Sequence, residues 1–169
     1  MIMQKIYSTF YASPIGPLRI SCNEGCITEV HFLKKDEPFQ ATTIVPGAPP
    51  VLQQCIKELT AYFNGRLKTF EVPVYQEGTD FQQKVWNELM NIPFGKTISY
   101  LTLAKRLGDP KSIRAAASTN GKNCIAVIVP CHRVIGSNND LVGYGGGLWR
   151  KRWLLEMETK ITYGVQTLF

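Results

Sequence analysis

The spacing of hydrophobic residues in the first part of the chain predicts strands followed by one helix. Residues 6–33 alternate between apolar and polar positions, and turn signals at 13–17 and 23–25 divide them into strands. An apolar stripe with helical spacing begins at Val51, and Asn64-Gly65 ends it. This part of the chain therefore predicts a small sheet accompanied by a helix.

Two segments without helical or strand spacing of apolar residues divide the chain further. Residues 36–50 contain four prolines and a glycine and predict a loop. Residues 71–80 resemble a linker, and the balance of charge changes there. We therefore expect two domains, residues 1–78 and residues 79–169.

The second domain opens with a helix start signal. Thr79 and Gln82 fit a capping box, in which each residue bonds the backbone of the other. The apolar residues that follow, Phe81, Val85 and Leu89, have the spacing of a buried helical stripe. The sequence thus predicts a helix directly after the linker.

Two short helices joined by a tight turn are predicted next. Ser99 can cap a helix that runs to Leu107, and Asp109-Pro110 can start a second helix that runs to Asn120. Helix, glycine-containing turn and helix fit a helix-turn-helix, although many other helix pairs share this shape. The run of small residues 115–118 on the second helix permits close approach, either of a neighbouring helix or of a DNA groove.

The distribution of charge separates the two halves of the chain. The net charge is +6; residues 1–80 have a net charge of −1 and residues 81–169 a net charge of +7. A basic second half favours a polyanionic partner such as nucleic acid, and a solvated basic surface is the alternative.

Composition also bears on where the protein works. No stretch reaches the roughly 20 apolar residues that span a bilayer, and residues 1–10 lack the apolar core of a signal peptide. The five cysteines are scattered and odd in number, which suits free thiols in a reducing compartment. We therefore expect an intracellular protein without a membrane partner.

The most informative segment is the one that ends in a thiol, an imidazole and a guanidinium. The apolar run 125–129 predicts a buried strand or extended core segment, and Cys131, His132 and Arg133 follow Pro130. A thiolate is the reactive form of cysteine, and a neighbouring histidine can act as its base. Because the chain has only two histidines, this arrangement favours a nucleophile. An inert buried cysteine beside a surface His-Arg pair is the alternative.

The same segment resembles the active-site signature I-P-C-H-R-V of the O6-alkylguanine-DNA alkyltransferases, also called methylated-DNA–protein-cysteine methyltransferases. This chain has Val129-Pro130-Cys131-His132-Arg133-Val134 at that place. Matches continue in register over residues 81–158 and more weakly over 1–80. They include Phe81-Gln82, Val85-Trp86, Pro93-Phe94-Gly95, Ser99-Tyr100, Asn123, residues 143–148, Lys151, residues 153–155, Glu158 and, in the first domain, Ser13-Pro14-Ile15-Gly16.

The resemblance implies a fold and an activity. The fold would be an α/β ribonuclease-H-like N-terminal domain and a mostly α-helical C-terminal domain of the winged-helix or helix-turn-helix kind. The activity would be direct-reversal DNA repair by a suicide methyltransferase, which moves an alkyl group from O6-alkylguanine irreversibly to Cys131 after base flipping. O4-alkylthymine would be a further candidate substrate.

The resemblance also implies roles for single residues near the nucleophile. Cys131 would accept the alkyl group, His132 would activate it through a water, and Glu158 would orient His132. Tyr100 would donate a hydrogen bond or proton to the leaving guanine, and Asn123 would brace the active-site turn.

Further residues would bind the DNA or the flipped base. Arg114 would fill the gap in the base stack, on a DNA-binding helix that includes Ala115, Ala116, Ala117 and Ser118. The substrate pocket would be lined by Val134, Tyr144, Gly145 and Lys151. Arg133 and Lys151 would act structurally or electrostatically near the site, with a phosphate contact open to either.

Two departures from the family pattern affect these expectations. Gly145 stands where some members have a serine, so a hydroxyl contact is lost and the rigidity of the loop is in question. Some members bind a structural zinc, which needs four ligands. Cys22, Cys26 and His31 are three candidates that do not fall on the matching positions, so we expect no metal and no cofactor.

The expected partner is double-stranded DNA that carries alkylated bases, bound by a monomer. The compartment would be the cytoplasm with its nucleoid in a prokaryote, or the nucleus in a eukaryote. Three rival functions are a non-catalytic binder of damaged DNA, a transcription regulator and a cysteine hydrolase. The binders lack the cysteine, the small residues 115–118 suit sequence reading poorly, and a hydrolase would turn over repeatedly.

Overall fold

A computed structural model describes residues 3–40 and 46–164 of the chain. The chain forms two compact units. Unit 1 contains the N-terminal part up to Gln76 together with residues 124–128, and unit 2 contains residues 77–123 and the part from Val129 onward. A single boundary at 78 differs from this division, because residues 124–128 return to the first unit.

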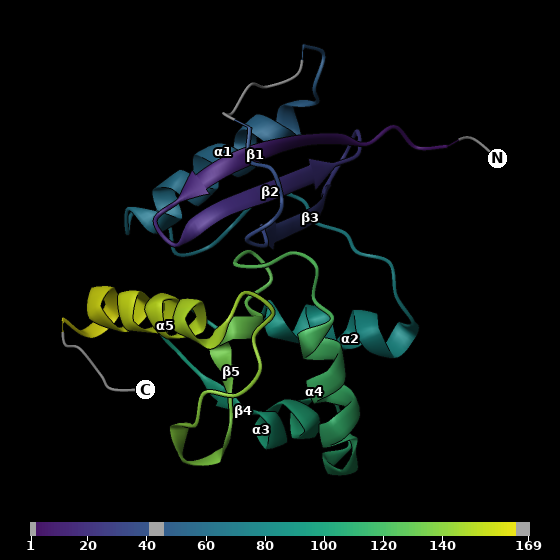
Figure 1. Cartoon of the computed structure of the whole chain (residues 1–169). Coiled ribbons are helices and arrows are strands. Elements are labelled where there is room, and N and C mark those ends of the chain that lie inside the picture. Colours follow the sequence, from purple (N-terminus) through teal and green to yellow (C-terminus); the bar gives the residue numbers. More distant parts are fainter. Residues whose placement is uncertain (1–2, 41–45, 165–169) are drawn as a thin grey trace. The chain divides into compact units, whose positions relative to one another are not determined.

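Unit 1 is built on a three-stranded antiparallel sheet, as the alternating pattern predicted (Figure 1). The strands β1 (Tyr7–Ser13), β2 (Gly16–Cys22) and β3 (Ile27–Phe32) pair in sequence order. Ser13 pairs with Gly16, so the first hairpin turns over two residues. The buried side chains of β2 and β3 form the core of this unit.

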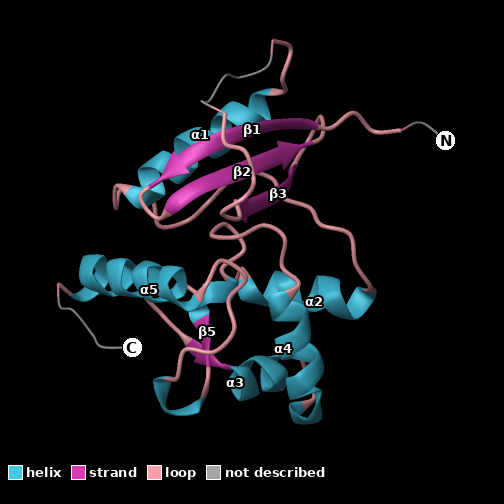
Figure 2. Ribbon diagram, viewed as in Figure 1, coloured by secondary structure: helices cyan, strands magenta, loops and turns pink. Residues whose placement is uncertain are grey.

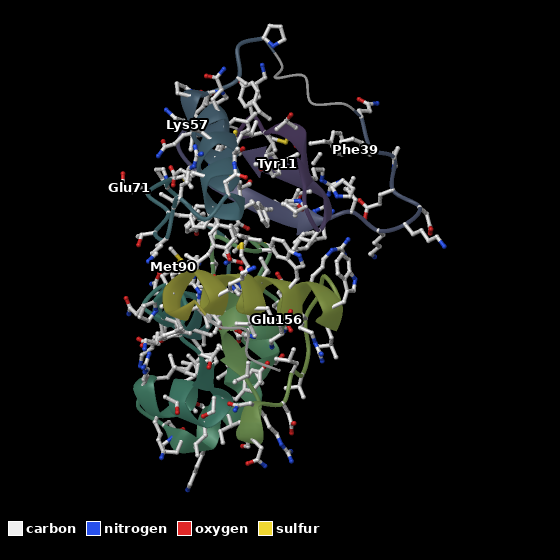
Figure 3. The ribbon with its side chains drawn as sticks, turned by 90° about the vertical axis from the view of Figure 1, so that its left-hand side faces the viewer. Tyr11, Phe39, Lys57, Glu71, Met90 and Glu156 are labelled. Atoms are coloured by element: carbon white, nitrogen blue, oxygen red, sulfur yellow. The ribbon has the colours of Figure 1, made fainter. Side chains whose placement is uncertain are left out.

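Helix α1 (Pro50–Phe63) packs beside the sheet of unit 1. The predicted stripe is confirmed, because Val51, Cys55, Leu59, Tyr62 and Phe63 are all buried. The hydroxyl groups of Tyr11 in β1 and Thr60 in α1 are 3.1 Å apart. Figure 3, in which Tyr11 is labelled, shows the helix alongside the sheet. Of the predicted loop 36–50, residues 41–45 lie outside the described residues.

The predicted linker 71–80 is partly a structural element of unit 1. Val72 is buried, and Val74 forms a parallel bridge with Ile27 at the start of β3. The backbone N–H of Ile27 donates to Pro73, and that of Tyr75 donates to Ile27. Composition alone suggested a free linker, but backbone pairing depends on partners distant in sequence and leaves no compositional signal.

Unit 2 contains four helices and a short parallel sheet among the described residues (Figure 2). Helix α2 (Asp80–Leu89) has the predicted capping box of Thr79 and Gln82. Helix α3 (Tyr100–Arg106) is capped by the Ser99 side chain, as predicted. Strands β4 (Ile98–Ser99) and β5 (Val134–Ile135) pair in parallel. The predicted stripe of α2 needs one correction, because Trp86 is buried and Phe81 only half-buried.

The second helix of the predicted helix pair begins later than expected. Asp109 caps a single 3-10 turn, Pro110–Ser112, and helix α4 (Ile113–Gly121) follows. Helix α4 contacts both α2 and α3, and helix α5 (Leu148–Tyr163) contacts the turn that carries Cys131. None of the helices within residues 3–40 and 46–164 is long and apolar enough to cross a membrane.

Candidate active site

Two tight turns lead the chain into the candidate nucleophile. Val127 has a φ of 69°, and the N–H of Ile128 donates to Ala126 at 2.8 Å, which closes a three-residue turn. The N–H of Cys131 donates to Val129 at 2.8 Å and closes a second such turn. The predicted segment 125–129 is mostly buried, and Ile125 pairs like a strand residue through a parallel bridge with Val30. The prediction was wrong for the residues that follow, which are turned rather than extended.

Cys131 lies in a single 3-10 turn, Cys131–Arg133, and its side chain is almost completely buried. Burial raises the pKa of the Cys131 thiol, and a hydrogen bond from Asn123 and the charge of Lys151 partly oppose this rise. The amide of Asn123 also donates to the carbonyl of Val129 at 2.9 Å. Asn123 therefore braces this turn. Because the raised pKa favours the neutral thiol, the nucleophile needs a base.

His132 is completely buried and bonded to Glu158. Its Nε2 lies 3.0 Å from Oε1 of Glu158, and its Nδ1 has no hydrogen-bond partner among the described residues. Burial lowers the pKa of His132 more than the neighbouring Glu158 raises it, so the ring is neutral at pH 7. With Nε2–H donating to the carboxylate, Nδ1 carries the lone pair and is the nitrogen able to accept a proton.

Arg133 holds the carboxylate that orients His132. Its Nε donates to Oε2 of Glu158 at 3.0 Å and its Nη2 donates to Oε1 at 2.8 Å, a bidentate ion pair. Its Nη1 donates to the carbonyl of Ile92 at 2.7 Å. Burial alone would raise the pKa of Glu158, but hydrogen bonds from His132 and Arg133 and the charge of Arg133 hold it well below its ordinary value. Glu158 is therefore a buried anion, and Arg133 is its counter-ion.

Lys151 is a second buried cation in the site. Its Nζ donates to three backbone carbonyls, those of Val134 at 2.7 Å, Val142 at 2.9 Å and Gly143 at 3.3 Å. Burial lowers the pKa of Lys151 to about 8, although Cys131 opposes the shift. The phosphate contact considered for Lys151 and Arg133 does not fit the structure, because both side chains are buried. Lys151 instead holds the loop that follows β5.

Two tyrosines, Tyr100 and Tyr144, interact electrostatically with the thiol of Cys131. The Tyr100 hydroxyl donates to the carbonyl of Val142 at 3.2 Å. Burial and the charge of Cys131 raise the pKa of Tyr100, and they raise that of Tyr144 further. Both phenols therefore stay protonated at pH 7 and can donate hydrogen bonds.

The other predicted pocket residues differ in their exposure. Gly145 is exposed, and a Cβ added there would meet no heavy atom within 4 Å. A serine would therefore fit at this position. The side chain of Val134 is completely buried in β5 and contributes no surface to a pocket, which corrects its predicted role.

The predicted DNA-binding residues of α4 lie on more than one face of the helix. Arg114, Ala115 and Ser118 are exposed, and Ala117 is half-buried. Ala116 is completely buried, so its inclusion in a DNA-binding surface was wrong. The small side chain at 116 instead permits α4 to pack closely within its own unit, which was the alternative for this run.

The three metal candidates of the N-terminal part are not arranged as a metal site. Cys22 is buried, and the two ring nitrogens of His31 lie 3.2 Å and 3.4 Å from carboxylate oxygens of Glu29 and Glu37. The described residues contain no group of three or more His, Cys, Asp or Glu side chains that could hold a metal ion.

Two polar residues of the site received no specific role in the sequence analysis. Asn120 is buried, and its amide donates to the carbonyl of Cys131 at 3.3 Å. The bidentate pairing of Arg133 with Glu158 was also not predicted, since 25 residues separate the two. The burial of an arginine beside a histidine has no local signal, because only the tertiary fold brings its partner close.

The fold and the site define a class of protein: a buried thiol next to a histidine that is bonded to a carboxylate, in the same unit as a basic helix pair. Residues 80–160 match the family described as "6-O-methylguanine DNA methyltransferase, DNA binding domain", and residues 6–76 match its "ribonuclease-like domain". The chain belongs to the family of methylated-DNA–protein-cysteine methyltransferases.

Individual relatives agree with this assignment. The methylated-DNA–protein-cysteine methyltransferase of Methanosarcina acetivorans is 41% identical over 153 residues, which cover 90% of this chain and 98% of that protein. The crystal structure of the Mycobacterium tuberculosis O6-methylguanine methyltransferase has a TM-score of 0.80 at 41% identity, and the match covers 92% of this chain and 94% of that one. The M. tuberculosis protein in complex with DNA has a TM-score of 0.80 at 44% identity, covering 90% and 92%.

Proposed function

We propose that this protein repairs DNA by transferring an alkyl group from O6 of guanine to Sγ of Cys131. The observation that carries the proposal is the pair of buried contacts from His132 and Arg133 to Glu158, made by the same turn that carries Cys131. O4-alkylthymine is a second candidate substrate of the same chemistry. The rest of the proposal concerns the proton, the leaving group and the DNA.

The proton of the thiol passes to Nδ1 of His132 through a water. Glu158 stabilises the imidazolium that forms, because its carboxylate accepts from Nε2 in both protonation states. Arg133 keeps Glu158 ionised throughout. The arrangement follows the general logic of a nucleophile, a base and an orienting group.

The transfer forms one bond and breaks one. The S–C bond forms on Cys131 while the bond between the alkyl carbon and O6 breaks, and the electron pair stays on the guanine. The guanine anion accepts a hydrogen bond or a proton from Tyr100. The proton that His132 took from the thiol balances the charge, since it can replace any proton that Tyr100 gives up. Water does not hydrolyse the resulting thioether, so each molecule acts once.

The DNA is engaged through helix α4. The alkylated oxygen is sheltered inside a duplex, so the nucleotide must turn out of the stack, which costs a few kcal/mol. Arg114 is exposed near the start of α4 and is suited to fill the gap. The DNA complex of the M. tuberculosis relative supports DNA as the partner.

The finer expectations about fold and setting belong to the same proposal. We infer a ribonuclease-H-like unit 1 and a winged-helix or helix-turn-helix unit 2, which bind double-stranded DNA as a monomer. The name "ribonuclease-like domain" of the matching family supports the first. The protein would work beside its DNA, in the cytoplasm of a prokaryote or the nucleus of a eukaryote.

A titration tests the function against its rivals. The protein is mixed with excess duplex oligonucleotide that carries O6-methylguanine, and the repaired strand is counted. We expect a plateau at one repaired base per protein molecule. Continued turnover would indicate a hydrolase, and tight binding without repair would indicate a non-catalytic binder. Strong preference for one undamaged sequence would indicate a regulator.

A further inference from the structure

The wall of the candidate pocket is a glycine-rich loop with little restraint of its own beyond one turn bond, from the N–H of Gly147 to the carbonyl of Tyr144 at 2.9 Å. Residues 143–147 contain four glycines, and Gly143 and Gly147 have φ values of 60° and 93°. A Cβ added at Gly143 or Gly145 would meet no heavy atom within 4 Å. Glycine has the largest conformational freedom of all residues. The position of this wall therefore depends mainly on residues outside it.

Two consecutive cations at the start of α5, the helix on which Figure 3 labels Glu156, supply that restraint. Lys151 holds the N-terminal end of the loop through the carbonyls of Val142 and Gly143. Arg150 holds the C-terminal end, because its Nη1 donates to the carbonyl of Gly146 at 2.8 Å. The two side chains thus fix opposite ends of the glycine run.

The guanidinium of Arg150 is itself held in place by a neighbouring ring. Its central carbon lies 4.6 Å from the ring centroid of Trp149, which is within the range of a cation–π contact. A Cβ added at Gly147 would lie 3.3 Å from Cδ1 of Trp149, so the indole lies directly against the end of the loop. Trp149 is 57% exposed, which is unusual for so large an apolar side chain and leaves it without a core role.

The loop that Arg150 restrains lies beside the reacting thiol. The Nζ of Lys151 joins the two, because it donates both to the carbonyl of Val134, three residues after Cys131, and to that of Gly143 at the start of the loop. An alkyl group in line with Cys131 therefore lies near the residues that follow Tyr144. At Gly145 no side chain limits the room for that group.

We propose that Arg150, stacked on Trp149 and bonded to Gly146, is a positioning residue that fixes the glycine wall and so determines how well the site accepts large alkyl groups. This inference rests on the proposed transfer to Cys131. A methyl group reaches little beyond the reacting carbon, so its transfer depends little on the position of the wall. A benzyl group must rest against the wall, so its transfer depends on a fixed position of Gly145 and Gly146.

The test compares two duplexes of one sequence, carrying O6-methylguanine or O6-benzylguanine. For Arg150→Ala we expect the ratio of benzyl to methyl transfer rates to fall roughly tenfold, as for the loss of a charge-assisted hydrogen bond. Free O6-benzylguanine should slow similarly. Arg150→Lys keeps a cation able to reach Gly146 and should recover most of the ratio. Trp149→Phe should recover more than Trp149→Ala.

Arg152→Ala is the matched control, since Arg152 is an exposed arginine on the same helix. Its ratio should equal that of the wild type. If Arg150→Ala slows both duplexes equally and leaves the free base unaffected, Arg150 contacts phosphate and the inference is wrong. An equal loss on all substrates with a lowered melting temperature would show a merely structural role and would also overturn it. If the wild type takes no alkyl group from either duplex, the proposed function itself fails.

Discussion

Two regions of unit 2 lie in opposite surroundings. One is the buried cluster formed by Cys131, His132, Arg133 and Glu158, and the other is the exposed face of α4, formed by Arg114, Ala115 and Ser118. The first is a charged network inside the core, where each charge must have a partner. The second consists of one cation and small side chains in water. Changes in the cluster should therefore affect stability and chemistry together, whereas changes on α4 should affect only the reaction with DNA.

The largest expected effect is that of Glu158→Gln. The substitution leaves Arg133 buried without its counter-ion, and breaking a buried ion pair from one side costs about 3–5 kcal/mol. Denaturant unfolding should show this loss, and transfer to Cys131 should become undetectable.

A stable Glu158→Gln variant would show that Arg133 does not depend on this carboxylate. The double variant Glu158→Gln with Arg133→Met removes both charges and is the control. It should recover part of the lost stability without recovering transfer.

Arg114→Ala should leave stability unchanged and slow repair in duplex DNA roughly ten- to hundredfold, because the extruded nucleotide loses the residue that fills its place. The reaction with free O6-benzylguanine needs no extrusion and should proceed as in the wild type. Lys111→Ala, which removes another exposed positive charge before α4, is the control and should have a smaller effect on the duplex. Equal slowing of the free base and the duplex would argue against a wedge.

Alkylation should destabilise the cluster from within. Cys131 is only 7% exposed, and extra methylenes in a packed site cost about 1–3 kcal/mol. Melting temperature should fall by roughly 2–4 °C for each kcal/mol in a chain of this size. Paired thermal melts of free and benzylated protein measure the change, with Cys131→Ala treated in the same way as the control. An unchanged or higher melting temperature after benzylation would mean that the site has room for the adduct.

The smallest effect concerns acid. Burial lowers the pKa of His132, so below about pH 6.5 the unfolded chain binds a proton that the folded chain does not. The free energy of unfolding should thus fall as pH falls from about 6.5 toward the lowered pKa of His132 in the folded chain, by up to about 1.4 kcal/mol per pH unit. The lowered pKa of Glu158 acts in the same direction but at lower pH.

Unfolding curves at several pH values test this slope. The chain has only two histidines, so His31→Asn and His132→Asn form a matched pair. The slope should disappear in His132→Asn and persist in His31→Asn. A slope that persists in His132→Asn would contradict the assignment to this ring.

The same contrast explains what could be predicted from the sequence. Capping by Thr79 and Ser99 and the stripe of α1 depend on residues a few positions apart, and these predictions are confirmed. The start of α4 was missed because Pro110 can begin either a 3-10 turn or an α-helix. Local patterns therefore reveal most helix ends.

The contacts that make the site depend on residues far apart in sequence. Neither the buried ion pair of Arg133 and Glu158 nor the three carbonyl contacts of Lys151 has a local signal. The sequence could not show that Ala116 is buried while its neighbours are exposed. Four small residues in a row lack the alternation of large apolar and polar side chains that marks the buried face of a helix. The positive φ of Val127 opposes the preference of a β-branched residue, so propensity predicts the reverse.

The most direct test asks which of the five cysteines receives the alkyl group. Cys124 is exposed, whereas Cys131 is buried, so simple reactivity with an alkylating agent would favour Cys124. The protein is incubated with a duplex that carries O6-methylguanine, and its peptides are mapped by mass spectrometry. We predict one added methyl group per molecule, on the peptide that contains Cys131. A methyl group on Cys124, or repair without any gain in protein mass, would contradict the account.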